Sequence, residues 1–210
     1  GTYQAMLRSI AQARHYVHME TYIFDDDAQG ARFAEALIAA RNRGADVALM
    51  VDAVGTIKTP DALFQRLRDA GVQVAVFNPV SPVNGSRAGW SPNQRNHRKI
   101  LVVDGKVGYL GGINVSDVYA SSPASGSGGS GGVGSGADAR RADARAAPWR
   151  DTHLRIEGPA VAQLEAVIRD GWQSQAKEPL RGGGDAIAAV IAAVRVPPSA
   201  CRTSQSNVTV

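Results

Sequence analysis

Cysteines and long hydrophobic runs are scarce in this sequence, and each scarcity excludes a class of protein. Its 210 residues include one cysteine, Cys201, so no intrachain disulfide can form. The fold therefore does not depend on an oxidising compartment, and we expect a cytoplasmic protein. No apolar run approaches the roughly 20 residues that span a bilayer. Any membrane contact is expected to be peripheral, at the inner face of the membrane.

A strong excess of charge of one sign is also missing. The 23 Lys and Arg residues against 19 Asp and Glu residues give a net charge of +4. This mild basic excess fits an anionic partner, but nucleic acid, phospholipid headgroups and phosphate esters satisfy it equally. His15, His18 and Glu20 match no tight zinc spacing and lack a third strong ligand, so we expect neither a metal nor another cofactor.

Segments with the patterns of strands and helices alternate along the chain. This alternation predicts an α/β domain with a mixed, largely parallel sheet flanked by helices. A hairpin is expected at Asp104-Gly105, a pair of residues typical of tight turns. Strands are expected at 16–24, 47–51, 72–77, 99–103, 107–110 and 152–156, and helices at 3–13, 33–44, 62–70 and after Pro159.

One long segment interrupts this pattern. Residues 121–136 are almost entirely Ser, Gly and Ala, and the chain is then rich in Arg, Ala and Asp up to residue 147. Because this run lacks the strand and helix that flank a phosphate-binding loop, we interpret residues 121–147 as a flexible insertion. Residues 1–180 are predicted to form one lobe, and residues 181–210 a poorly organised tail or the start of a second lobe.

Residues 96–105 carry the main chemical signal. Alternate residues of a strand share a face, so His97 and Lys99 are expected to point the same way. An imidazole is a competent nucleophile toward a phosphodiester, and a neighbouring ammonium neutralises charge on the phosphate oxygens. After the hairpin come Gly111 and Gly112, which permit close approach of the backbone to a ligand. The amide of Asn114 can donate to a phosphoryl oxygen.

This segment fits the pattern H-x-K-x4-D-x6-G-G-x-N throughout. The pattern resembles the HKD signature of the phospholipase D superfamily, and its surroundings are similar to the bacterial cardiolipin synthase branch. The likeness extends from about residue 3 to residue 172, apart from the insertion. It rests on His97, Lys99, Asp104, Gly111, Gly112 and Asn114, and on the runs Glu20-Thr21-Tyr22-Ile23-Phe24, Phe77-Asn78-Pro79, Trp149-Arg150-Asp151-Thr152-His153 and Gly158-Pro159-Ala160-Val161.

The resemblance implies a metal-free, two-step displacement at phosphorus within one lobe of a two-lobed enzyme. It implies that His97 forms a phosphohistidine, and that Lys99 and Asn114 bind the phosphoryl group beside Gly111 and Gly112. Asp104 belongs to the catalytic motif as a structural partner in the hairpin. Asp151 would hydrogen-bond the far nitrogen of His97 and fix its tautomer, as the orienting carboxylate does in a catalytic triad.

Several residues keep two interpretations. Asp151 either orients His97 or forms a surface ion pair with Arg150. Glu20 either reaches the substrate from a neighbouring strand end or is a buried carboxylate whose hydrogen bonds are satisfied. His153 either lines the site or packs structurally. The remaining residues with open roles are Trp90 and Trp149, which could meet an acyl chain, and Arg140, Arg141, Arg145 and Arg150, which we interpret as a solvated basic loop.

Three functions follow from these residues. The first is a cardiolipin synthase-like phosphatidyltransferase that acts on anionic phospholipid with a second HKD lobe. The second is a nuclease-like phosphodiesterase that builds its site as a homodimer with one motif per chain; nucleic acid is the less favoured partner. The third is an incomplete half-enzyme, because no second copy of the motif occurs in the sequence.

Overall fold

The computed structural model describes residues 1–79, 94–120 and 151–184. These residues form a six-stranded sheet in the order β3-β2-β1-β4-β5-β6. The predicted insertion at 121–147 and most of the predicted tail lie outside the described residues. Along the chain the elements are α1 (Thr2–Gln12), β1 (Tyr16–Thr21), α2 (Ala28–Asn42), β2 (Asp46–Asp52), α3 (Asp61–Asp69), β3 (Gln73–Phe77), β4 (Ile100–Val103), β5 (Val107–Gly111), the 3₁₀ helix η2 (Asp117–Tyr119), β6 (His153–Glu157) and α5 (Val161–Gln175).

The sheet is mixed, and its two halves differ in direction. Strand β1 pairs in parallel with β2, and β2 in parallel with β3, through the two helical crossovers that the alternating pattern predicted. Strands β4, β5 and β6 are antiparallel to their neighbours, and a short turn joins β4 to β5. The α/β class and the mixed sheet are confirmed, and the parallel part is confined to β1, β2 and β3.

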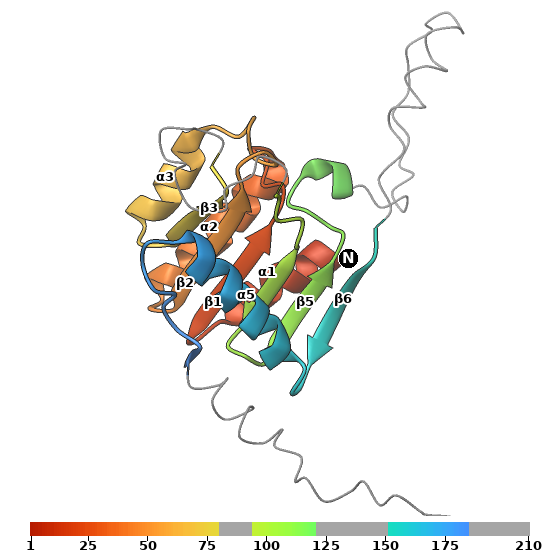
Figure 1. The fold of residues 1–210 in the computed structure, drawn as a ribbon. Helices are drawn as coiled ribbons and strands as arrows, with labels where there is room; N and C mark the ends of the chain where they lie inside the picture. Colours follow the sequence, from red (N-terminus) through yellow and green to blue (C-terminus); the bar gives the residue numbers. More distant parts are fainter. Residues whose placement is uncertain (80–93, 121–150, 185–210) are drawn as a thin grey trace, which may run out of the picture.

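Helices cover both faces of the sheet, which gives three layers (Figure 1). Helices α1, α2 and α3 pack on one face, and α5 packs across the other. Strand β1 is buried along its whole length because it lies in the middle of the sheet, under helices on both sides. The main core contains Ile10, Phe33, Leu37, Leu49, Leu67 and Leu101, and the smaller clusters under α5 contain Val102, Ile168 and Trp172.

Most boundaries fall within a few residues of the predicted ones. The predicted strand 16–24 ends at Thr21, although Phe24 still forms a single bridge to Val115. Asp27 begins α2 as its N-cap and accepts a hydrogen bond from the Gly30 amide at 2.9 Å. Strand β4 begins at Ile100, so residues 94–99, which contain His97 and Lys99, lie before the strand in an extended segment without regular secondary structure.

The predicted hairpin joins β4 and β5. Asp104 and Gly105 both have positive φ, at 51° and 63°, and Val103 pairs with Val107. The Asp104 carboxylate accepts hydrogen bonds from the backbone amides of Arg14, His15 and Tyr16 at 2.8–2.9 Å. Asp104 thus lies in the hairpin and holds the start of β1 through these hydrogen bonds.

Candidate active site

Asp52 anchors the segment that carries the motif. It is the last residue of β2 and is fully buried. One carboxylate oxygen accepts the Asn96 amide at 2.9 Å, and the other accepts the Val54 amide at 2.8 Å and the Gly55 amide at 3.2 Å. Arg95 approaches the same carboxylate at 3.7 Å. The residue just before His97 is therefore tied to the end of a core strand.

Glu20 anchors the same segment from β1. Its fully buried carboxylate lies 2.9 Å from the Arg98 Nε. It also accepts a long hydrogen bond, at 3.4 Å, from the side-chain Nδ2 of Asn96. Burial raises the pKa of Glu20 to about 7, although Arg98 and Asn96 oppose the rise. Glu20 is thus a buried, paired carboxylate. It forms an ion pair with Arg98, which lies between His97 and Lys99 in the sequence.

His97 and Lys99 meet at the ring of Tyr22. The exposed His97 imidazole stacks on this ring, with centroids 3.9 Å apart and planes inclined at 26°. The Lys99 Nζ donates to the His97 carbonyl oxygen at 2.6 Å and lies 5.3 Å from the centroid of the Tyr22 ring. Burial lowers the pKa of Lys99, while Asp151 and Asp52 act in the opposite direction. The two motif residues are brought together although no regular strand holds them.

Asn114 connects the segments next to Tyr22 through hydrogen bonds. Its side-chain oxygen accepts the Ile23 amide at 3.0 Å, and its Nδ2 donates to the Tyr119 hydroxyl at 2.8 Å. The hydroxyl of Tyr3 donates to its backbone carbonyl. These contacts fix the backbone next to Tyr22. Asn114 is itself buried, and its predicted contact with a phosphoryl oxygen stays a prediction.

Gly111 and Gly112 make room for the chain that enters β6. A Cβ atom on Gly111 would lie 2.2 Å from the Thr152 carbonyl oxygen, and one on Gly112 would lie 1.9 Å from the Asp151 Oδ1. The Gly112 amide donates to the Thr152 carbonyl at 2.9 Å. The close approach predicted for these glycines is therefore occupied by the protein itself, and it brings Asp151 beside Gly112 and within electrostatic reach of Lys99.

Asp151 is exposed, and its Oδ1 accepts the Thr152 amide at 3.1 Å. Its predicted hydrogen bond to His97 is not formed among the described residues, so that pairing stays a prediction. His153 pairs with Gly111 across the sheet edge, and neither ring nitrogen has a partner in the described part of the chain. Burial lowers the pKa of His153 to about 4, so its ring is neutral at neutral pH.

Asp104 lies at the far end of β4 from His97. In the register of β1 and β4, Val17 pairs with Val103, the residue before Asp104. Glu20 pairs with Ile100, the residue after Lys99. Although burial raises the pKa of Asp104, the backbone hydrogen bonds from Tyr16, Arg14 and His15 lower it below its ordinary value. Its place in the motif is structural, and it does not line the candidate site.

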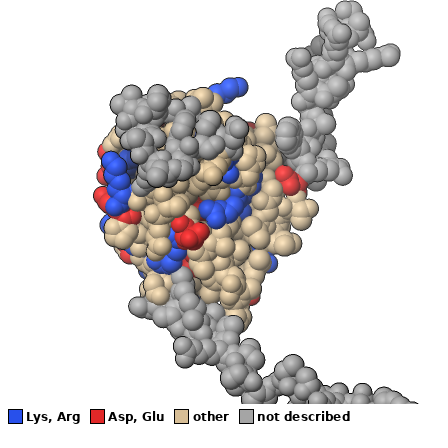
Figure 2. Space-filling view, in the orientation of Figure 1, with Lys and Arg blue, Asp and Glu red and all other residues tan. Residues whose placement is uncertain are grey.

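A cavity of about 460 Å³ opens beside the candidate nucleophile. Its lining consists of Phe77, Arg95, Asn96, His97 and Arg98. On the face that carries α5, Figure 2 shows a compact group of basic atoms next to an acidic one. The Arg95 and Arg98 guanidinium groups of this lining lie near the buried Asp52 and Glu20 carboxylates, which balance their charge in part.

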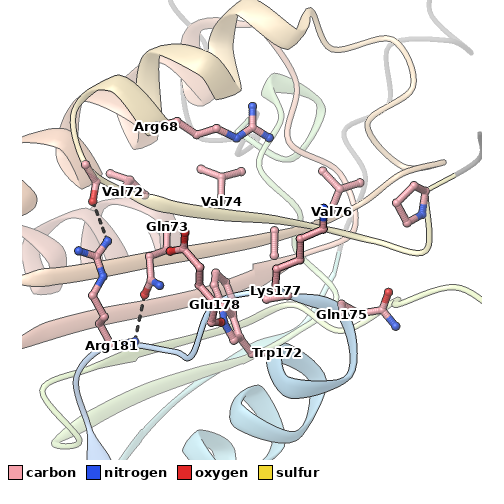
Figure 3. A pocket seen from close by; sticks show the side chains of 14 residues that line it. Arg68, Val72, Gln73, Val74, Val76, Trp172, Gln175, Lys177, Glu178 and Arg181 are labelled. Carbon is pink, nitrogen blue, oxygen red and sulfur yellow. Dashed lines mark hydrogen bonds between the residues drawn. The ribbon is translucent and has the colours of Figure 1, made fainter. Parts of the chain in front are cut away.

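A second cavity, of about 520 Å³, lies along β3 between the end of α3 and the segment after α5. Figure 3 shows Gln73 and Arg181 joined there, and the Gln73 side chain also donates to the Pro179 carbonyl at 3.0 Å. None of its lining residues was predicted as a site residue. We therefore assign the candidate site to the cavity beside His97.

Sequence reasoning missed part of this site. Tyr22 entered the sequence analysis only as part of the run Glu20-Thr21-Tyr22-Ile23-Phe24, and its stacking on His97 arises only in three dimensions. A polar residue directly after a buried strand was a usable signal for Asp52, because strand ends gather functional groups in α/β folds. Arg98 and Asn96 carried no signal beyond their place in the motif. Trp90, Trp149 and the arginines of the insertion lie outside the described residues.

Neither a metal site nor a membrane-spanning helix was found in the described ranges. No group of three or more His, Cys, Asp or Glu side chains there could hold a metal ion. No helix within residues 1–79, 94–120 and 151–184 is long and apolar enough to cross a membrane.

Comparison with known proteins identifies related sequences. Residues 6–121 match a family described as cardiolipin synthase, phospholipase D-like domain. The chain is 34% identical over 172 residues to cardiolipin synthase 2 of Bacillus anthracis, which covers 81% of this chain and 29% of that protein. It is 34% identical over 182 residues to cardiolipin synthase A of Pseudomonas fluorescens, covering 85% of this chain and 32% of that protein. The chain thus spans about a third of the length of these relatives.

Among solved structures, the fold is similar to that of Nuc from Salmonella typhimurium, described as a phospholipase D family member. The two share 17% sequence identity with a TM-score of 0.52, over 86% of this chain and 89% of that chain. At this identity the likeness concerns the fold alone.

Proposed function

This chain belongs to the family of cardiolipin synthase, phospholipase D-like domains, and from that premise we propose that it provides one catalytic lobe for phosphatidyl transfer. The donor would be an anionic phospholipid and the acceptor an alcohol. One observation carries the proposal: His97 and Lys99 both contact the Tyr22 ring, His97 lines a cavity, and Asp151 is close enough to act on Lys99.

In the first step, a ring nitrogen of His97 would attack the phosphorus of the donor. A phosphorus–nitrogen bond forms and the bond from phosphorus to the leaving alkoxide breaks, giving a phosphohistidine that carries the phosphatidyl group. The Lys99 ammonium and the side-chain amide of Asn114 would stabilise the charge on the phosphoryl oxygens. Asp151 would hold the other nitrogen of His97.

In the second step, the acceptor alcohol would attack the phosphorus and break the bond to His97. The leaving alkoxide needs a proton in the first step, and the acceptor gives one up in the second. Of the four histidines in the sequence, His97 alone is followed two residues later by a lysine. We therefore assign the proton donor to a second H-x-K pair, in another lobe or in a second copy of this chain.

A phospholipid substrate would require the cavity beside His97 to meet a membrane surface. We place that contact at the inner face of the membrane, as a peripheral one. The net charge of +4 supports attraction to anionic headgroups.

The test is lipid turnover with trapping of the intermediate. Incubation with phosphatidylglycerol should yield cardiolipin and glycerol, and mass spectrometry of protein quenched in base should locate the transferred group on His97. The His97→Ala variant should give neither result. The matched control is His15→Ala, because His15 is exposed and lies at the Asp104 end of the sheet. Lipid turnover that survives in His97→Ala would overturn the proposal.

The single motif favours one alternative, a homodimeric nuclease-like phosphodiesterase. It predicts a dimer on sedimentation and DNA cleavage that is lost in His97→Ala. A half-enzyme predicts a monomer that binds inorganic phosphate through Lys99 and Asn114 without turnover of either substrate. Sequencing the coding DNA beyond Val210 separates these from the two-lobed form, which requires a second H-x-K pair downstream.

A further inference from the structure

Tyr22 lies directly after β1, and both motif side chains contact its ring. The His97 imidazole stacks on it at a centroid separation of 3.9 Å. The Lys99 Nζ lies 5.3 Å from the ring centroid, within the range of a cation–π contact. The ammonium of Lys99 also donates to the His97 carbonyl oxygen at 2.6 Å, so the three side chains form one compact group.

The position of Tyr22 is itself fixed by neighbouring segments. A Cβ atom on Gly55 would lie 1.9 Å from the Tyr22 carbonyl oxygen and 3.0 Å from the ring atom Cδ2, so the loop after β2 packs directly on this residue. The following residue, Ile23, donates its amide to Asn114 and accepts the Val115 amide at 3.2 Å. The ring therefore has a supporting contact from the loop after β2 and a fixed backbone.

The His97 ring has no comparable support of its own. Its backbone is held indirectly, through Asn96 on Asp52 and through Arg98 on Glu20, but the imidazole is exposed. The stacked Tyr22 ring restrains the imidazole plane. An unrestrained imidazole rotates broadly about its second side-chain torsion, and this rotation would move the attacking nitrogen away from phosphorus.

We propose that Tyr22 is a positioning residue for the transfer reaction, whose stacked ring fixes the plane of His97 and keeps the Lys99 ammonium beside it. The catalytic consequence rests on the proposed function; the geometric effect does not. No bond to Tyr22 forms or breaks. Because the effect comes from the face of the ring, Phe should replace Tyr22 and an aliphatic residue should not.

The geometric effect is tested by NMR on the intact chain, with no substrate. Stacking on an aromatic ring shifts the His97 ring-proton resonances upfield. This shift should persist in Tyr22→Phe and disappear in Tyr22→Leu. Gly55→Ala should reduce it without removing the ring, since the added methyl group displaces Tyr22. The matched control is Tyr109→Leu, which removes a buried aromatic residue of β5 and should leave the His97 resonances unchanged.

The catalytic consequence is tested by turnover of bis(p-nitrophenyl) phosphate. Tyr22→Leu should lower kcat by about tenfold or more with little change in KM, and Tyr22→Phe should stay close to the original chain. Unchanged His97 resonances in Tyr22→Leu would overturn the positioning role, and so would equal kinetic losses in the Phe and Leu variants. A chain that shows the NMR effect but no turnover at all would overturn transfer by copies of this chain alone, and it would leave the positioning of His97 by Tyr22 supported.

Discussion

The Arg98 guanidinium lies 2.9 Å from the Glu20 carboxylate, and this pair links the central strand of the sheet to the residue between His97 and Lys99. The carboxylate is fully buried, while the side chain of Arg98 is about one-third exposed. Because water reaches the Arg98 guanidinium and weakens its attraction to Glu20, the ion pair offsets only part of the free-energy cost of burying the Glu20 charge. This relationship makes stability depend on pH.

Glu20→Gln should flatten the pH dependence of stability. The pKa of Glu20 is raised to about 7 in the folded chain, so between about pH 4.5 and pH 7 the unfolded chain loses this proton first. The contribution of Glu20 to the free energy of unfolding therefore falls as the pH rises, by about 3 kcal/mol across that window. Urea unfolding at pH 5 and pH 8 should show the original chain losing stability relative to Glu20→Gln. A relative gain would contradict the raised pKa.

Asp104→Ala should destabilise the fold without altering the site. Three backbone amides at the start of β1 donate to this carboxylate, and their loss should lower the free energy of unfolding by about 2 to 3 kcal/mol. Since the pKa of Asp104 is lowered, its contribution is present at neutral pH and is lost as the pH falls through the folded value.

Asp104→Asn separates charge from backbone conformation at the same position. Asn tolerates the positive φ of 51° and keeps one acceptor oxygen, so it should retain more stability than Ala. Phosphate binding, measured below the unfolding temperature, should be unchanged in both variants because the carboxylate lies at the far end of β4. Weakened phosphate binding in folded Asp104→Asn would argue against this separation.

Gly112→Ala should displace Asp151. The new methyl group would lie 1.9 Å from the Asp151 Oδ1, so the carboxylate must move away from this end of β5. Because Asp151 holds the pKa of Lys99 up, its displacement should lower that pKa further and reduce transfer activity. NMR titration of Lys99 in Gly112→Ala and in Asp151→Asn should give shifts in the same direction. Gly184→Ala is the control, since a Cβ atom there meets nothing within 4 Å.

His18 and Glu165 should prove strongly coupled. The His18 Nδ1 lies 2.8 Å from the Glu165 carboxylate, and its Nε2 lies 2.7 Å from the Arg181 carbonyl oxygen. A carbonyl oxygen only accepts, so Nε2 carries a hydrogen and a second hydrogen is shared between Nδ1 and Glu165. This fully buried pair joins β1 to α5 and to the segment after it.

His18→Leu should therefore cost about 3 to 5 kcal/mol of unfolding free energy, because it leaves the buried Glu165 carboxylate without this partner. In the His18→Leu background, Glu165→Leu should lower the free energy of unfolding by less than it does in the original chain. The difference, which is the coupling energy, should be about 1 to 3 kcal/mol. Denaturant unfolding of the two single variants and the double variant measures this cycle. Additive losses would show that the two side chains act independently.

The sequence alone determined the fold class and the candidate reactive residues. Alternating apolar periods specified the parallel β1–β3 half of the sheet, since each crossover needs its own amphipathic helix. The uninterrupted motif spacing singled out His97, Lys99 and Asn114, because residue identity and spacing are local properties of the chain. Asp104-Gly105 predicted its turn for the same reason, as only a few residue pairs adopt positive φ readily.

Only the tertiary structure decided how these residues are supported. His97 and Lys99 share no regular strand, and they meet at the ring of Tyr22, a residue that follows β1 more than 70 positions earlier in the chain. The space beside Gly111 and Gly112 is filled by residues 151–153 of the same chain. Glu20 forms an ion pair with Arg98. Such contacts depend on which strands become neighbours, and neighbours are set by packing across the whole sheet, which local patterns do not encode.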